Sequence, residues 1–180
     1  AAEDEGRWNL DLGDVVPPLS IADLASWDGS STEISLPRFD VTPEPGQEHE
    51  GGRGVVVRGV PTMQVAGRTV TTVFDLLLAQ YGVGRDGIPG EWPSGYDDAS
   101  TVGTPAWQEE ITSVPAVQAT RIAREFADTA ERSGGRSMIL MGAGTNHWFH
   151  SDTIYRTFLA LTTMTGCQGI NGGGWAHYVG

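Results

Sequence analysis

Two glycine-rich segments near the end of this chain constrain its fold more than any other feature. The first follows the apolar run Ser137–Met141 and reads Gly142-Ala-Gly-Thr-Asn-His147. The second holds three consecutive glycines, Gly172 to Gly174, and is followed at once by Trp175 and His177. Glycine permits a positive φ and a close backbone approach, but ordering it costs much conformational entropy. We therefore predict two ordered bends whose backbone approaches one large polar ligand.

The residues around the first bend predict a strand, a turn and a helix. The run Ser137–Met141 is short and continuously apolar, which is typical of a strand covered on both faces. After the bend, Asp152 begins a segment whose apolar residues share one helical face. These residues are Ile154, Phe158, Leu161 and Thr165. Ligands of open α/β sheets bind where such a strand ends. The alternative is that Gly142 and Gly144 only form a tight turn, because the three-glycine dinucleotide fingerprint is incomplete.

Three further helices are predicted before the strand. One begins at Thr72 and is closed by Gly82, and a second begins at Thr104-Pro105, an N-cap residue followed by a proline at the first helical position. The third begins at Pro115 and ends at Gly134-Gly135, directly before the strand. The order helix, strand, glycine loop, helix indicates an α/β fold.

The first part of the chain has a different character. Residues 1–69 combine prolines and acidic tracts with short apolar runs, which indicates an irregular connecting segment with a few β-strands. The predicted strands are Glu33–Phe39, Gly54–Val60 and Thr62–Val70, the last two as a hairpin around Gly59 to Pro61. The predicted fold class is thus α/β, with a partial doubly wound unit over residues 70–180 after this segment.

Charge and cysteine content exclude several classes of site. The chain has 23 acidic and 11 basic residues, and every basic residue is arginine. A surface of this sign disfavours nucleic acid as a ligand. The absence of lysine fits either adaptation to high salt or a GC-rich genome. Cys167 is the single cysteine, so we expect no internal disulfide, no structural zinc site and no iron-sulfur cluster within the chain.

Several motifs together resemble one known family. They are Tyr81-Gly82, Ser94-Gly-Tyr-Asp-Asp98, Thr104-Pro-Ala-Trp107, Ile122-Ala-Arg-Glu-Phe-Ala127, Gly142-Ala-Gly-Thr-Asn-His-Trp148 and Gly172-Gly-Gly-Trp-Ala-His-Tyr-Val-Gly180. From about Val70 onward the chain resembles the catalytic alpha subunits of respiratory nitrate reductases, a branch of the molybdopterin oxidoreductase (dimethyl sulfoxide reductase) family. The resemblance is fainter around Trp8 and Gly46.

The resemblance implies an internal fragment of a larger enzyme that reduces nitrate to nitrite by two electrons. It implies molybdenum held by two molybdopterin guanine dinucleotides, and a [4Fe-4S] cluster bound outside this fragment. Neither a metal ligand nor a catalytic residue is expected here, because the family carries both before this region. The implied partners are the remainder of the alpha subunit, an iron-sulfur beta subunit, a membrane cytochrome b subunit and nitrate. Association with the membrane through these subunits is expected, at the cytoplasmic face or, in a halophilic archaeon, at the outer face.

The resemblance also implies which residues contact the cofactor. They are Gly142, Gly144, Thr145, Asn146, His147, Gly172, Gly173, Gly174, Trp175 and His177, with His147 as the foremost polar contact. Within the family, chlorate, perchlorate and selenate are alternative substrates. A nucleotide-binding Rossmann oxidoreductase is disfavoured, because no acidic residue lies about 20 positions after the first bend. A non-catalytic interaction module that uses Trp8, Trp27 and Trp148 is the alternative from another class.

Overall fold

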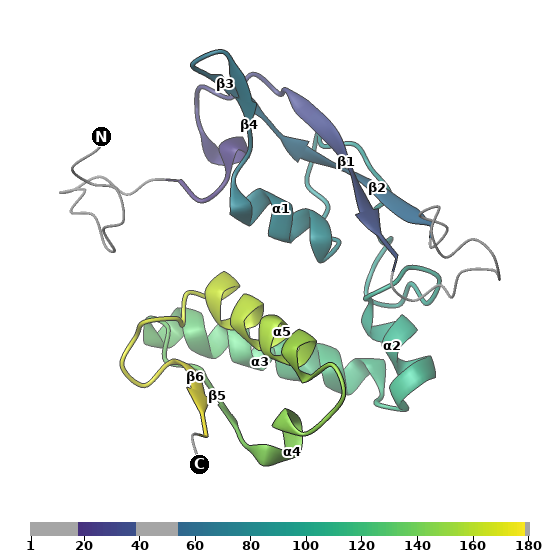
Figure 1. The fold of residues 1–180 in the computed structure, drawn as a ribbon, viewed down its shortest axis with the longest axis vertical. Helices are drawn as coiled ribbons and strands as arrows, with labels where there is room; N and C mark the ends of the chain where they lie inside the picture. The colour runs from purple at the N-terminus through teal and green to yellow at the C-terminus, as the bar shows by residue number, and fades with distance from the viewer. Residues whose placement is uncertain (1–17, 39–53, 179–180) are drawn as a thin grey trace. The chain divides into compact units, whose positions relative to one another are not determined.

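The computed structural model describes residues 18–38 and 54–178, which belong to two compact units that meet in sequence at Trp92 and Pro93 (Figure 1). The first unit is mainly β-structure and the second mainly helical with one strand pair. The chain is therefore a mixed helix and strand fold with a partial α/β unit, as its sequence predicts. The predicted domain boundary between residues 69 and 70 concerns the parent polypeptide and stays a prediction.

The first unit contains two antiparallel strand pairs. Strand β1 (Ser31–Pro37) pairs with β2 (Val55–Pro61), so that Ser31 lies opposite Pro61 and Pro37 opposite Val55. Strand β3 (Met63–Val65) pairs with β4 (Arg68–Val70). The chain reverses between β3 and β4 at Ala66 and Gly67, both of which have a positive φ. Two positive φ angles are what a tight type I′ hairpin turn requires.

The predicted hairpin around Gly59 to Pro61 is therefore wrong. Gly59 lies inside β2, and its backbone N–H donates to the carbonyl oxygen of Pro89 at 2.7 Å. A Cβ atom on Gly59 would lie 2.5 Å from that oxygen. The glycine thus admits a neighbouring segment against the strand and does not reverse the chain. The C-terminal end of the predicted strand Glu33–Phe39, at Phe39, lies outside the described residues.

Helix α1 (Val73–Gln80) follows β4 and carries Asp75, whose buried side chain is the centre of a hydrogen-bond network. The side chain of Thr72 accepts a hydrogen bond from the Asp75 N–H and caps the helix, as the sequence predicts. The Asp75 carboxylate is fully buried and accepts hydrogen bonds from the Ser20 hydroxyl at 2.6 Å and from the Arg85 guanidinium at 2.7 Å. The short 3₁₀-helix η2 (Ile21–Asp23) begins beside this carboxylate, and its first backbone N–H, that of Ile21, also donates to Asp75.

The second unit begins with two helices whose ends lie close to the predicted residues. Helix α2 (Pro105–Thr112) has Thr104 as N-cap and proline at its start, and α3 (Ala116–Ser133) ends at Gly134 in the left-handed region. The chain then enters strand β5 (Met138–Met141), helix α4 (Ala143–Asn146), helix α5 (Ser151–Met164) and strand β6 (Gly174–His177).

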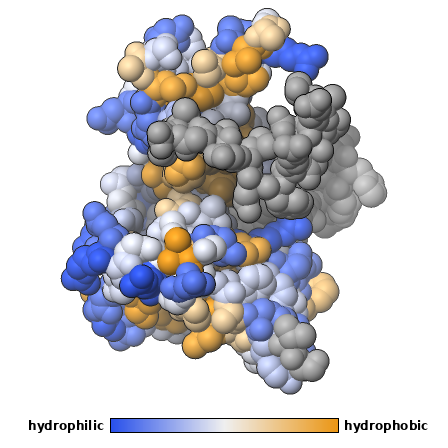
Figure 2. All heavy atoms as spheres, turned by 90° about the vertical axis from the view of Figure 1, so that its left-hand side faces the viewer, coloured by the Kyte–Doolittle hydropathy of each residue, from blue (hydrophilic) through white to orange (hydrophobic). Residues whose placement is uncertain are grey.

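Strands β5 and β6 are parallel neighbours, and α5 packs against both (Figure 1). The register places Met138 opposite Gly174 and Met141 opposite His177. Strand, helix, parallel strand is the βαβ unit of an α/β fold. Strand β5 was expected to be covered on both faces, but Leu140 is 79% exposed while Met141 is buried. Within the described residues, helix packing therefore covers one face of this strand. Exposed hydrophobic residues of this kind appear orange in Figure 2.

Candidate functional site at the carboxyl end of the parallel strands

The first glycine bend follows the carboxyl end of β5, as predicted, but its backbone differs from the expectation. Gly142 has an extended φ of −141°, and Gly144 lies inside α4. Neither glycine has a positive φ, so the bend does not use the conformational freedom that glycine permits there. The chain turns through a short helix, in which the Gly142 carbonyl accepts a hydrogen bond from the Thr145 N–H at 3.0 Å.

Space around these two glycines is open. A Cβ atom on Gly144 would meet no atom within 4 Å, and one on Gly142 would approach only Tyr178, at 3.9 Å. Internal packing within the described residues therefore does not require glycine at either position. Open space above the backbone at a strand's carboxyl end is where a ligand of an α/β sheet lies.

Polar and aromatic side chains gather beside this bend. The side chain of Asn146, from α4, lies with Nδ2 3.2 Å from Nε2 of His177 at the end of β6. The hydroxyl of Tyr155, from α5, lies 3.4 Å from the same nitrogen. The rings of Tyr155 and Trp175 have centroids 5.4 Å apart. Asn146, Tyr155, Trp175 and His177 are called the histidine cluster below.

The histidine cluster contains buried polar atoms without a partner. Asn146 Oδ1 and Trp175 Nε1 have no hydrogen bond within the described structure. An unsatisfied buried polar group costs about 1–3 kcal/mol, so proteins rarely leave one unpaired. The cluster therefore has spare capacity both to accept and to donate a hydrogen bond. A ligand with carbonyl, amide and phosphate groups, such as a pterin dinucleotide, matches this mixed capacity.

Two other predicted contacts lie on the same bend. Thr145 is half-buried in α4, and His147 is the exposed residue that ends α4, with its N–H donating to the Ala143 carbonyl at 3.3 Å. The fold thus brings together the residues of the first bend with Trp175 and His177. Tyr155 was missed by sequence reasoning, because its position on the helix gives no sign of which strand it faces.

The second glycine bend lies at the other end of the strand pair. Gly174 is opposite Met138, three residues before the end of β5, so the two bends are about 10 Å apart along the strands. Gly172 and Gly174 have positive φ angles of 85° and 86°. A Cβ atom on Gly173 would overlap the carbonyl oxygen of Gly135. The structure thus does not bring the two bends to one side, and internal packing explains at least Gly173.

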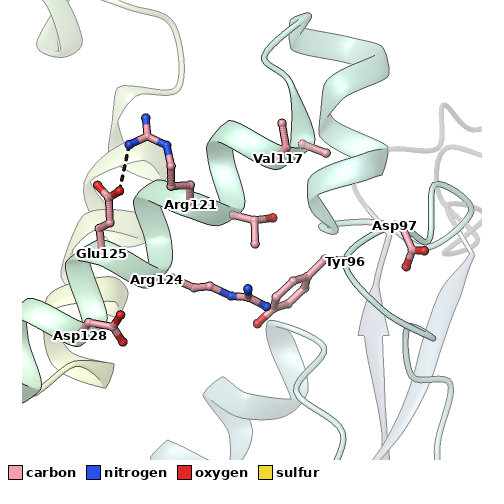
Figure 3. A pocket seen from close by; sticks show the side chains of 9 residues that line it. Tyr96, Asp97, Val117, Arg121, Arg124, Glu125 and Asp128 are labelled. Carbon is pink, nitrogen blue, oxygen red and sulfur yellow. Dashed lines mark hydrogen bonds and ion pairs between the residues drawn. The ribbon is translucent and has the colours of Figure 1, made fainter.

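Two hollows on the surface of α3 were not indicated by the sequence. One has a volume of about 500 Å³ and is lined by residues that include Tyr96, Val117, Arg121, Arg124 and Asp128 (Figure 3). The other, of about 590 Å³, shares Tyr96, Thr120 and Arg124 with the first. The Arg124 guanidinium lies 5.4 Å from the centroid of the Tyr96 ring, a cation–π distance. Neither hollow includes a residue of the glycine bends.

Near the second unit's first helix, Asp98 organises a loop. Its carboxylate accepts hydrogen bonds from Ser100, Ser94 and Thr101, and these donors hold the pKa of Asp98 far below its ordinary value. The carboxylate is therefore ionised throughout the neutral range and acts as an acceptor that shapes the loop. It is not suited to acid catalysis, which needs a pKa near the working pH.

Residues 18–38 and 54–178 contain no group of three histidine, cysteine, aspartate or glutamate side chains placed to hold a metal ion. Cys167 is fully buried next to Thr165. In the same ranges, every helix is too short or too polar to cross a bilayer. Trp148 is 70% exposed, Trp27 is half-buried, and Trp8 lies outside the described residues.

The second unit is thus part of an α/β domain with polar groups at the carboxyl ends of its parallel strands. Comparison with known proteins identifies the relatives of the whole chain. The chain is homologous to nitrate reductase alpha subunits. It is 55% identical over 177 residues to the nitrate reductase alpha subunit of Mycobacterium tuberculosis, which covers 97% of this chain and 14% of that protein. No protein-family model matches the chain.

Two further relatives bear on the substrate. The respiratory nitrate reductase 1 alpha chain of Escherichia coli is 43% identical over 185 residues, which is 98% of this chain and 15% of that protein. Perchlorate reductase subunit alpha of Dechloromonas aromatica is 48% identical, but over 77 residues, 43% of this chain and 8% of that protein. The chain therefore spans about a seventh of the length of the nitrate reductase relatives and matches them along nearly all its own length.

Proposed function

We propose that this chain is a segment of the alpha subunit of a molybdenum-dependent nitrate reductase. The observation that carries the proposal is the 55% identity to a nitrate reductase alpha subunit across 97% of the chain. When bound, a molybdenum bis(molybdopterin guanine dinucleotide) cofactor supplies two-electron transfer and acceptance of an oxygen atom from nitrate. Iron-sulfur centres elsewhere in the enzyme supply the electrons.

The role of this segment in that enzyme is to hold and orient the cofactor. Contacts are proposed from the first bend, through Gly142, Gly144, Thr145, Asn146 and His147, and from Trp175 and His177 in β6. Open space over Gly142 and Gly144 and unpaired polar atoms in the histidine cluster support these contacts. For Gly172, Gly173 and Gly174, contact with the cofactor also remains proposed, at a second point along the dinucleotide, since these residues lie at the opposite strand end.

Partners and location follow from the same proposal. The segment works within the remainder of its alpha subunit, together with an iron-sulfur beta subunit and a membrane cytochrome b subunit. These subunits attach the enzyme to the membrane in anaerobic nitrate respiration. The residues described here carry no feature that selects one membrane face, so the cytoplasmic and the outer face are both retained.

A substitution at His147 tests the proposed contacts in the complete alpha subunit. We expect His147→Ala to lower bound molybdopterin guanine dinucleotide about tenfold, since a hydrogen bond to a charged group contributes about 1.5–3 kcal/mol. Nitrite formation with a reduced viologen dye should fall in parallel. His150→Ala is the matched control, because His150 is also exposed but packs against Phe149 with the two rings tilted, their centroids 3.9 Å apart.

The same preparation tests substrate and class. Nitrate should be reduced more efficiently than chlorate, perchlorate or selenate, and residues 1–180 alone should reduce none of them because the metal ligand lies elsewhere. A complete subunit that prefers perchlorate would support the relative in Dechloromonas aromatica as the better guide to function. A complete subunit with neither molybdenum nor activity would favour the non-catalytic interaction module instead.

A further inference from the structure

The histidine cluster has a geometry that bears on the protonation of His177. The imidazole of His177 packs edge-on against Tyr155 at a centroid distance of 5.6 Å and against Trp175 at 5.5 Å. These residues come from α5 and β6, and Asn146 adds a polar contact from α4. Three elements thus fix the orientation of one imidazole ring at the strand ends.

Two polar groups converge on one nitrogen of that ring. Asn146 Nδ2 lies 3.2 Å from His177 Nε2, and the Tyr155 hydroxyl lies 3.4 Å from the same atom. An amide nitrogen can only donate a hydrogen bond, and a ring nitrogen that carries a proton cannot accept one. With the amide in this orientation, Nε2 is the acceptor and carries no proton. In the neutral ring the proton then sits on Nδ1.

We propose that Asn146 is the positioning residue that fixes His177 in the Nδ1–H tautomer, and that the Tyr155 ring holds the orientation of the imidazole. His177 then presents a single N–H donor of fixed direction at the carboxyl ends of β5 and β6. This inference rests on the proposed function for its second half, in which the acceptor is a carbonyl or phosphate oxygen of the pterin dinucleotide. The first half, the tautomer, depends only on residues of this chain. His177 is exposed, so its donor is accessible to such an oxygen.

The tautomer is measured by ¹⁵N and ¹³C NMR of histidine-labelled chain, at a pH well above the ordinary histidine pKa of about 6.5. The sequence holds four histidines, and loss of one signal pair in His177→Gln assigns the resonances. We expect a protonated Nδ1 and an unprotonated Nε2. Asn146→Asp replaces the donor by a carboxylate that only accepts, so it should move the proton to Nε2.

Tyr155→Phe keeps the ring but removes a hydroxyl that can either donate to Nε2 or accept from an Nε2–H, so the Nδ1–H to Nε2–H ratio should stay nearly unchanged. Tyr96→Phe is the matched control, since Tyr96 stacks with Arg124 elsewhere in the same unit and should leave the ratio unchanged. An Nε2–H tautomer in the unsubstituted chain overturns the proposal, as does an Asn146→Asp chain that keeps Nδ1–H. Should the isolated chain fail to fold, solid-state NMR of the complete alpha subunit gives the same readout.

The cofactor half is tested in the complete alpha subunit by measuring guanine nucleotide released on acid treatment. We expect Asn146→Asp and His177→Gln each to lower the bound nucleotide, with Tyr96→Phe unchanged. If the unsubstituted chain has the Nδ1–H tautomer but Asn146→Asp and His177→Gln both keep the bound nucleotide unaltered, the donor role of His177 is refuted. Active enzyme with an Nε2–H tautomer refutes the positioning role and leaves the proposed function intact. A subunit without any pterin dinucleotide refutes the proposed function and leaves the tautomer assignment standing.

Discussion

The contact between Gly173 and Gly135 leads to a quantitative prediction for the substitution Gly173→Ala. The alanine Cβ atom would overlap the carbonyl oxygen of Gly135 and lie 3.0 Å from the carbonyl oxygen of Cys167. Both neighbours are backbone atoms, so no side-chain rotation can relieve the overlap. The segment before β6 must therefore move away from the turn that precedes β5.

The size of the effect follows from what this movement disrupts. Overpacking a well-packed site costs about 1–3 kcal/mol. The shift also strains two backbone hydrogen bonds, from Gly173 N–H to the Ile170 carbonyl at 2.9 Å and from Gly174 N–H to the Ser137 carbonyl at 3.0 Å. Each such bond contributes about 1 kcal/mol net. We therefore expect a loss of about 3 kcal/mol, which for a unit of this size lowers Tm by roughly 12–24 °C.

Thermal and urea unfolding, followed by circular dichroism, measure this loss without any cofactor. Gly144→Ala is the matched control, because a Cβ atom there meets nothing within 4 Å and the residue lies in α4. Alanine is favoured over glycine in a helix, so the control should be neutral or more stable by up to about 1 kcal/mol. If Gly173→Ala is no less stable than Gly144→Ala, the contact with Gly135 does not hold the second bend in place.

Two further substitutions and one change of pH should each alter the stability of a single unit. Thr104→Ala should cost the second unit about 1 kcal/mol in urea unfolding by removing the cap on the Trp107 N–H, and Thr104→Ser should retain most of it. Arg85→Met should cost the first unit about 3 kcal/mol, because it leaves the buried Asp75 carboxylate without its cation, and a loss below about 1 kcal/mol would contradict that role. Burial raises the pKa of Asp75, but hydrogen bonds from Ser20, Ile21, Thr72 and Arg85 outweigh it and lower the pKa. The stability that Asp75 contributes is therefore present above its ordinary pKa of about 3.9 and is lost as pH falls through the lower folded value. Urea titrations between neutral and acidic pH should show this loss, and Asp75→Asn should reduce it.

The helices were predictable because their signals are local. Thr72, Thr104 with Pro105, and Gly134 each mark a helix end through hydrogen bonds or φ angles within a few residues. The same holds for the helical face after Asp152, which became α5. Local signals failed at Gly59, where glycine serves a contact with Pro89, thirty residues later in the sequence. A glycine in a sequence does not reveal whether it turns the chain or admits a neighbour.

The candidate site was predictable in part for the same reason. The order of strand and glycine segment located the first bend, and Asn146 and His177 were expected there on the resemblance. Their contact at 3.2 Å, and the presence of Tyr155 beside them, depend on how α5 returns the chain to β6. Parallel pairing sets the two glycine bends at opposite ends of the strand pair, and contact of both bends with one ligand stays a prediction.

Sequence alone determined where α1, α2, α3 and α5 begin and end, the strand before Gly142, and the homology to nitrate reductase alpha subunits, because these depend on residue types near one another in the chain. It did not predict the short helix α4. Tertiary structure decided the pairing of β1 with β2 and of β5 with β6, and hence which bend lies beside His177. It also decided that Gly173 serves internal packing, whereas Gly142 and Gly144 leave space free. The physical reason is that strand pairing and close packing join residues far apart in sequence, and their partners are set by the path of the whole chain.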